Sequence, residues 1–119
     1  MKGRSALYKQ IREAQSQTFI SYKGGILGTE DFFAPERKWD KESKKQVELC
    51  DTLQPHSWGQ KKSDNGKHKS PDQVMEMLEK AKKLNANLLL NTGPMPDGSI
   101  PAEDVAIFKE VGKRLKAGG

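Results

Sequence analysis

The apolar segment Asn87–Asn91 constrains the fold of this chain more than any other feature of its sequence. It holds three consecutive leucines with no polar residue between them, a pattern typical of a buried strand. Helix signals lie on both sides of it, one beginning near Ser70 and the other near Pro101. We therefore predict a strand at the centre of a packed sheet, with both of its faces covered and with a helix before and after it in the chain.

The two flanking helices carry clear start signals. Ser70 is a good N-cap, Pro71 suits the first helical position, and Gln73 completes a capping box. The second helix opens with Pro101 and has acidic residues in its first turn and basic residues near its end, the charge order that the helix dipole favours. Apolar residues recur at helical spacing along both segments, so each helix is expected to bury one face.

Further segments complete the predicted order of elements. Residues 5–15 have helical spacing, and residues 18–22 and 47–53 are predicted strands, the first β-branched and aromatic and the second alternating apolar with polar residues. Residues 24–46 show no sustained period and are predicted to form a long loop. Strands that alternate with helices predict an α/β fold with a parallel sheet. Because three parallel strands leave open edges, the fold resembles part of a larger sheet.

Composition narrows the class of protein. The chain has 119 residues, a formal net charge of +5 and one cysteine, Cys50, so we expect a single domain over residues 1–119 without an internal disulfide or a multi-cysteine zinc site. No apolar run approaches the roughly 20 residues that cross a membrane, and no apolar segment follows the basic N-terminus as in a secretory signal. The lysine-rich segment 60–69 lacks interleaved aromatic residues, so no nucleic-acid partner is expected.

Polar residues are expected at the carboxyl ends of the predicted strands, where parallel α/β sheets bind ligands. Glu30 follows the first strand, Glu48 lies on the second, and His56 and Trp58 follow it. Carboxylates with an aromatic ring, a histidine and amides have the composition of a sugar site, because carboxylates supply the acid, base and nucleophile of glycoside cleavage. The neighbouring polar candidates are Asp31, Asp51, Asn91 and Thr92.

Three motifs make the sequence similar to one enzyme family. They are residues 28–37 (GTEDFFAPER), residues 47–53 (VELCDTL) followed by HSWG at 56–59, and residues 87–94 (NLLLNTGP) followed by DGSIP at 97–101. In this order they resemble the α-L-fucosidases of glycoside hydrolase family 29. The resemblance extends over nearly the whole chain from residue 18 onward.

The resemblance implies a retaining glycosidase on a (β/α)8-like (TIM) barrel, in which an aspartate attacks the anomeric carbon and a glutamate acts first as acid and then as base. The chain resembles the C-terminal half of that barrel. Glu48 matches the glutamate motif and is the expected acid/base, although Val47 stands where a tryptophan is usual and Gln60 replaces a tyrosine. The family's nucleophilic aspartate lies upstream of anything that matches, so no residue here inherits its role. No metal or organic cofactor is implied.

The expected substrate is a terminal L-fucose on a glycan or fucoside, and four residues are predicted to bind it: Glu30, Glu36, His56 and Trp58. Structural roles are the alternatives, namely solvent-facing or loop charges for the glutamates, including Glu48, a packing anchor for the tryptophan and a hydrogen-bonded loop residue for the histidine. Retention requires a second carboxylate about 5 Å from the first. It is expected from a second copy of the chain or from one of Glu30, Asp31, Glu36 and Asp51.

Half a barrel leaves open strand edges and an uncovered apolar layer, so the partial barrel is predicted to be completed by self-association and a homo-oligomer is expected. Two alternative functions remain, a non-catalytic half-barrel that has lost its nucleophile and a basic binding module. The resemblance suggests a periplasmic or secreted location, although the chain shows no signal, and no membrane partner is expected.

Overall fold

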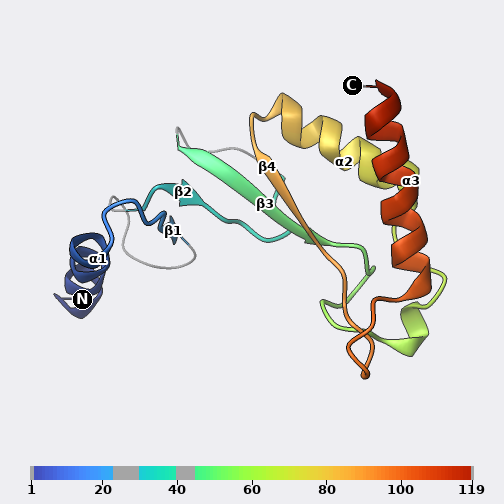
Figure 1. Ribbon diagram of the computed structural model, residues 1–119, viewed down its shortest axis with the longest axis horizontal. Helices are drawn as coiled ribbons and strands as arrows, with labels where there is room; N and C mark the ends of the chain where they lie inside the picture. Colours follow the sequence, from blue (N-terminus) through green and yellow to red (C-terminus); the bar gives the residue numbers. More distant parts are fainter. Residues whose placement is uncertain (1, 23–29, 40–44, 119) are drawn as a thin grey trace.

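The computed structural model describes residues 2–22, 30–39 and 45–118. Figure 1 shows a small α/β structure with one helix at one end, the strands in the middle and two helices at the other end. In chain order the elements are α1 (Lys2–Ala14), β1 (Ser21–Tyr22), β2 (Phe32–Phe33), β3 (Gln46–Thr52), the 3-10 turn η1 (Lys62–Asp64), α2 (Pro71–Lys83), β4 (Asn87–Asn91) and α3 (Ala102–Gly118).

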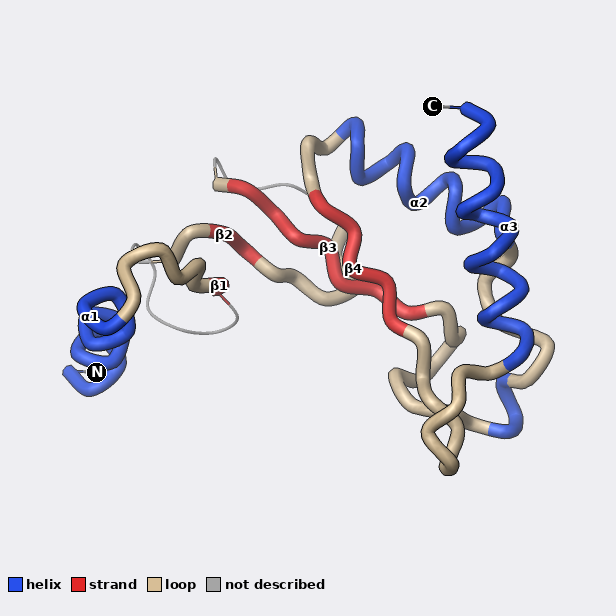
Figure 2. The backbone as a smooth tube through the Cα atoms, viewed as in Figure 1, coloured by secondary structure: helices blue, strands red, loops and turns tan. Residues whose placement is uncertain are grey.

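The strands form one parallel sheet in the order β1-β2-β3-β4. Its longest ladder joins β3 to β4, in register from Glu48 opposite Asn87 to Thr52 opposite Asn91. The order follows the chain without reversal, and α2 and α3 lie on the same side of β3 and β4 (Figure 2). A doubly wound sheet carries helices on both faces, so this arrangement resembles consecutive units of a barrel wall. The predicted α/β fold with parallel strands is confirmed.

The hydrophobic core lies between this sheet and the two helices. One cluster lies between α2 and the first half of β3. The other lies between α2 and α3, near the end of β3. Their buried members are Val47, Leu49 and Ala81 in the first cluster, and Leu53, Val74, Ile107 and Val111 in the second. Burial of a side chain of this kind stabilises a fold by about 1.5–3 kcal/mol. These clusters therefore fix α2 and α3 on one face of β3 and β4.

Helix α2 begins where the sequence predicts. Ser70 Oγ accepts a hydrogen bond from the Gln73 amide at 3.2 Å, and Gln73 Oε1 accepts one from the Ser70 amide at 2.8 Å. Pro71 occupies the first turn, so the capping box and the proline act together. Helix α3 also lies at its predicted place, with two acidic residues in its first turn.

Strand β4 has its predicted bounds but not its predicted place. Among the described strands it lies at the edge of the sheet, and Leu89 is 49% exposed. Leu88 and Leu90 pack against the core, whereas Leu89 points to the face that carries no helix. The prediction of a central strand covered on both faces is wrong. A run of leucines sends alternate side chains to opposite faces but does not determine what covers each face.

The predicted long loop contains a strand. β2 pairs with β1 and β3, and the chain after it stays beside β3, because the Cys50 amide donates to Pro35 O at 3.0 Å and the Arg37 amide donates to Cys50 O at 2.9 Å. A strand of two residues is too short to show a period, so the sequence pattern misses it. Residues 23–29 and 40–44 of the predicted loop lie outside the described residues.

Helix α1 lies apart from the core and is joined to the sheet through Asp31. The Asp31 carboxylate accepts hydrogen bonds from the Ile20 amide at 2.7 Å and from the Arg12 guanidinium at 3.1 Å. These donors, the Ile20 amide above all, hold the pKa of Asp31 below its ordinary value. Leu7 and Phe19 are exposed here. Among the helices that the structure describes, none is long and apolar enough to span a membrane.

Candidate functional site

One face of the sheet is packed under α2 and α3, and the other carries no helix among the residues that the structure describes. The candidate site lies on this second face, which we call the open face. Val47 and Leu49 point into the core, so the alternating Glu48 and Cys50 of β3 point to the open face. Glu36 is the bridge partner of Cys50 and shares its face. Register therefore places two glutamates on the open face.

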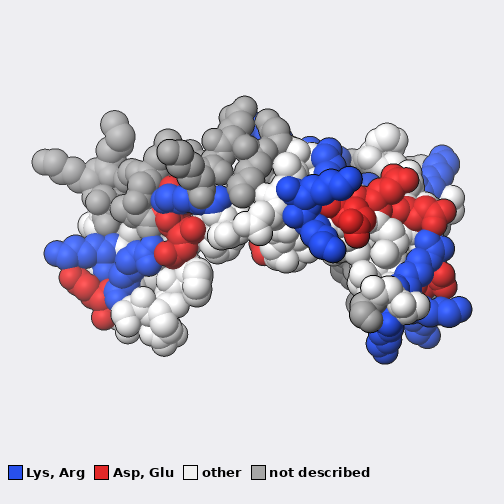
Figure 3. Space-filling view, turned by 90° about the horizontal axis from the view of Figure 1, so that it is seen from above, with Lys and Arg blue, Asp and Glu red and all other residues white. Residues whose placement is uncertain are grey.

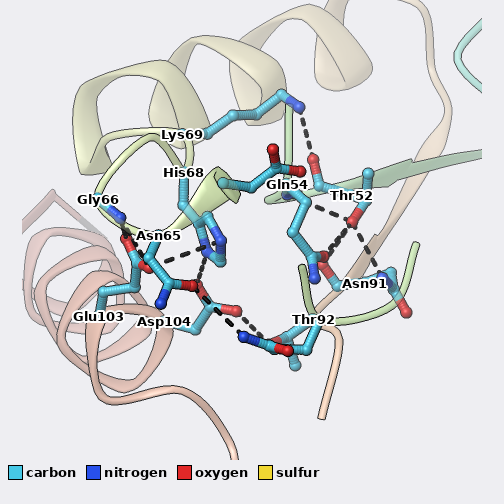
Figure 4. A network of polar contacts seen from close by, with 12 residues as sticks. Thr52, Gln54, Asn65, Gly66, His68, Lys69, Asn91, Thr92, Glu103 and Asp104 are labelled. Carbon is cyan, nitrogen blue, oxygen red and sulfur yellow. Dashed lines mark hydrogen bonds and ion pairs between the residues drawn. The ribbon is translucent and has the colours of Figure 1, made fainter. Parts of the chain in front are cut away.

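A loop folds over the carboxyl end of the open face and carries Trp58. Asn91 Nδ2 donates to Trp58 O at 2.8 Å and to Thr52 Oγ1 at 3.0 Å. Gln54 Nε2 donates to Gly59 O at 2.9 Å, and Gly93 lies directly against the backbone of residues 59 and 60. Figure 4 shows Thr52 joined to both Gln54 and Asn91 by hydrogen bonds. The ends of β3 and β4 thus hold the loop from below.

Arg37 and Trp58 form an exposed pair at this edge. The Arg37 guanidinium lies 5.0 Å from the centre of the Trp58 ring and donates to Ser57 O at 3.5 Å. The backbone of Arg37 has a φ of 53°, an uncommon conformation for a residue other than glycine. Trp58 is 37% exposed. A flat ring with a cation stacked on it offers a surface for the C–H face of a sugar and donors for its hydroxyl groups.

Glu48 and Glu36 lie at different depths beneath that pair. Glu48 is half-buried and accepts a hydrogen bond from Asn87 Nδ2 at 2.9 Å. It lies four residues before Thr52, about 13 Å from the carboxyl end of β3 at the usual rise of a strand. Glu36 is two residues higher in the register, beside Cys50. The two glutamates are diagonal neighbours, for which roughly 7–8 Å between Cβ atoms is usual.

The three other candidates for the second carboxylate have structural partners elsewhere in the described chain. Glu30 is buried at the amino end of β3 and forms an ion pair with Lys45 at 2.9 Å. Asp31 holds α1, and Asp51 points to the helix side, where Trp39 Nε1 donates to it at 3.0 Å. Of the four residues considered as a second carboxylate, Glu36 alone shares a face with Glu48.

His56 lies in the turns after β3 and is exposed, on the same loop as Trp58. The structure thus brings Glu36, His56 and Trp58 to the carboxyl edge, leaves Glu48 deeper in the sheet and separates Glu30 from all of them. No group of three or more His, Cys, Asp or Glu side chains within the described ranges is placed to hold a metal ion. On the face seen in Figure 3, acidic and basic side chains are interspersed at both ends of the molecule.

A second polar network lies behind the site and ties α3 to the end of β4. Asp104 is fully buried and contacts His68 Nδ1 at 2.5 Å, and it also accepts a hydrogen bond from the Thr92 hydroxyl (Figure 4). Glu103 accepts from the Gly66 amide at 3.1 Å and lies 3.6 Å from His68 Nε2. The network closes the loop before α2 onto α3. The Thr92 hydroxyl therefore helps to hold the end of β4 against α3.

Sequence reasoning missed two residues of this region, Arg37 and Gln54. Arg37 is part of the GTEDFFAPER motif. Its positive φ and its stacking on Trp58, 21 positions later in the chain, cannot be recognised from the residues around it in the sequence. Gln54 is a neutral residue two positions after a strand, and its burial to 1% exposure depends on the loop that covers it. Both residues follow the ends of strands, and this position in the sequence is the signal by which they could have been found.

Comparison with known proteins gives one consistent family. The family model for alpha-L-fucosidase matches residues 1–119. A curated protein of Caenorhabditis elegans, whose name places it among the α-L-fucosidases, is 33% identical over 95 residues, or 76% of this chain and 18% of that protein.

Solved structures agree with this match. The α-L-fucosidase isoenzyme 1 of Paenibacillus thiaminolyticus has a TM-score of 0.84 and 32% identity, over 96% of this chain and 30% of that one. The Thermotoga maritima α-fucosidase solved with a mechanism-based inhibitor has a TM-score of 0.80 and 23% identity, over 97% of this chain and 27% of that one. The second likeness, at low identity, shows the fold alone. This chain thus spans less than a third of the length of these relatives.

Proposed function

Since this chain belongs to the α-L-fucosidase family, we propose that its open face forms part of a site that hydrolyses terminal L-fucosides with retention. In this proposal the Trp58 ring packs against the C–H face of the sugar, and Arg37 and His56 contact its hydroxyl groups. The observation that carries the proposal is the shared face: two glutamates lie on the open face, and the residue that follows one of them stacks on an exposed aromatic ring at the carboxyl edge of a parallel sheet. Ligands bind at that edge in parallel α/β folds.

Two glutamates compete for the proton-transfer role. The family resemblance favours Glu48, which matches the glutamate motif. The geometry favours Glu36, because it lies nearer the carboxyl edge, is exposed and is next in sequence to the residue stacked on Trp58. Glu48 is half-buried, with Asn87 as a hydrogen-bond donor. In retaining glycosidases the two carboxyl groups lie about 5–5.5 Å apart, and long side chains on diagonal neighbours can approach to that distance.

Isosteric variants decide between the two glutamates. Release of 4-nitrophenol from 4-nitrophenyl α-L-fucoside is measured for the parent chain, Glu36→Gln, Glu48→Gln and the exposed α2 control Glu79→Gln. Loss of a general acid lowers turnover typically by about 10²–10⁴-fold. If Glu36 transfers the proton, its variant shows that loss and Glu48→Gln retains more than about a tenth of parental turnover. The reverse result assigns the role to Glu48, and equal activity of all four proteins contradicts the proposal.

A parent chain that binds L-fucose without turnover supports the non-catalytic alternative, in which the half-barrel keeps the sugar surface and lacks a nucleophile. Binding is measured by isothermal titration calorimetry with L-fucose. A parent chain that shows neither turnover nor binding contradicts the proposed function.

We further propose that self-association completes this site. Within the described residues β4 is an edge strand, and Leu89 is half exposed on the open face beside Cys50. An unpaired parallel edge with an apolar side chain next to it is a surface that sheets generally cover. A second copy placed there brings further carboxylates toward Glu36 and Glu48, which supports a shared site.

A further inference from the structure

Gln54 is a buried polar residue whose side-chain amide is hydrogen-bonded at both its oxygen and its nitrogen. Its side chain is 1% exposed, Oε1 accepts a hydrogen bond from the Thr52 hydroxyl at 2.8 Å, and Nε2 donates to Gly59 O at 2.9 Å. A buried amide without partners destabilises a fold by several kcal/mol in an apolar environment, so a glutamine persists at such a position when both of its ends are satisfied.

The hydrogen bonds around Gln54 form a directed chain. Asn91 Nδ2 donates to Thr52 Oγ1 at 3.0 Å, and the single proton of that hydroxyl points to Gln54 Oε1. Because Gln54 accepts at its oxygen, its nitrogen must face the Gly59 carbonyl. The chain runs from β4 through β3 to the loop, so the position of residue 59 follows from the ends of two strands.

The same groups bracket Trp58. Its own carbonyl is bound by Asn91, and the carbonyl of the next residue is bound by Gln54. Gly93 lies so close below that no side chain fits between it and the backbone of residues 59 and 60. The backbone at Trp58 is therefore held on its inner side while the indole projects outward beside Arg37.

We propose that Gln54 is a positioning residue that holds Trp58 in place before a sugar binds. The inference rests on the proposed function only in naming the sugar; the positioning itself is a property of the free chain. Preformed aromatic surfaces bind better because no loop has to be ordered on binding. Gln54 contacts no substrate in this arrangement and acts through the Gly59 carbonyl.

The test is Gln54→Glu, read through the fluorescence of Trp58. The chain has two tryptophans, so both proteins carry Trp39→Phe. The introduced carboxylate keeps an acceptor for Thr52 but places an oxygen against Gly59 O. At pH 8 we expect the indole of the variant to become more accessible to acrylamide than that of its parent. Near pH 4 the carboxyl group gains a proton, has an O–H to donate to Gly59 O, and the difference should disappear.

Val74→Ala is the matched control, because Val74 lies on the buried face of α2 and its truncation weakens the core without touching the loop. If general loosening explained the result, this variant would raise acrylamide quenching as much as Gln54→Glu does, and the proposal would be overturned. Quenching in Gln54→Glu that equals the parent at pH 8 also overturns it.

Titration with L-fucose tests whether the positioning of Trp58 affects sugar binding. We expect the affinity of Gln54→Glu for L-fucose at pH 8 to fall roughly tenfold, equivalent to about 1.4 kcal/mol, with recovery near pH 4. Unchanged affinity beside increased quenching overturns the claim that positioning serves the sugar. A parent that binds no L-fucose contradicts the proposed function instead, and the quenching result then decides on Gln54 by itself.

Discussion

Gly93 lies two residues after the end of β4, where the chain contacts the loop that carries Trp58. A Cβ atom at this position would lie 2.7 Å from Gly59 C and from Gln60 N, and closer still to Gln54 Nε2. Backbone atoms cannot move aside as a flexible side chain can. The glycine in the NLLLNTGP motif is therefore required by close approach and not by an unusual φ.

Replacement of Gly93 by alanine is expected to destabilise the chain by about 1–3 kcal/mol, the usual effect of overpacking. Gly112 is the matched control, because it lies inside α3 with open space around its Cα. Gly112→Ala should be neutral or stabilise the chain by up to about 1 kcal/mol, since alanine favours helices. Urea denaturation of both variants measures the difference, and equal midpoints would contradict the close-approach argument.

The element β4 shows how a strand can be assigned correctly and still be misplaced. Its leucines alternate between the face packed under α2 and α3 and the open face. Leu88 and Leu90 therefore supply most of the free energy of folding that comes from burying this strand's side chains. Leu89, which is 49% exposed, contributes little to the folding of a single chain.

At dilute concentration we expect Leu89→Ala to lower the free energy of unfolding by less than about 1 kcal/mol. Leu53→Ala, at a fully buried position between the same helices, is expected to lower it by about 2–5 kcal/mol. Chemical denaturation at low micromolar protein gives both values. Losses of similar size would show that Leu89 is covered in the folded chain.

The Asp31 carboxylate links α1 to the sheet through Arg12 and the Ile20 amide. Because the Ile20 amide and the Arg12 guanidinium lower its pKa in the folded chain, the stability that it adds is present above the ordinary aspartate pKa. That stability is lost as the pH falls from about 4 through the lowered folded value. The Ile20 amide proton should report this transition in an NMR titration, and Asp31→Asn should abolish it. A midpoint above about 4 would contradict the assignment.

At the scale of the whole molecule, helices cover one side of β3 and β4, and in the described part of the chain the loop around Trp58 covers the carboxyl end of the other side. The edge of β4 and the exposed Leu89 form one continuous surface. The proposed self-association uses this surface and would convert half a barrel wall into a closed sheet.

Sedimentation velocity over a range of micromolar concentrations is expected to show association of the 13.3 kDa chain. Leu89→Lys should weaken association without unfolding the chain, because a charge on an exposed strand opposes edge and face pairing. Lys82→Ala, at an exposed position on α2, is the control and should associate like the parent. A monomer at every concentration would contradict both the self-association and a site shared between copies.

The sequence by itself determined the elements whose signals are local. The capping box at Ser70, the apolar periods of α2 and α3 and the leucine run of β4 are each read from neighbouring residues, and the structure confirms where these elements lie along the chain. The motifs also identified the family, because several of them occur along this chain in the order that is typical of the family. The role of Glu48 stays a prediction.

Only the tertiary structure decided which faces are covered and which side chains meet. The exposure of Leu89, the separation of Glu30 from the site and the common face of Glu36 and Glu48 depend on sheet register and on the absence of helices from one face in the described structure. The same holds for Gln54, whose burial requires a loop folded back onto two strand ends. Local patterns encode the period of a side chain along its own element. They do not encode what another segment, distant in the chain, places opposite it.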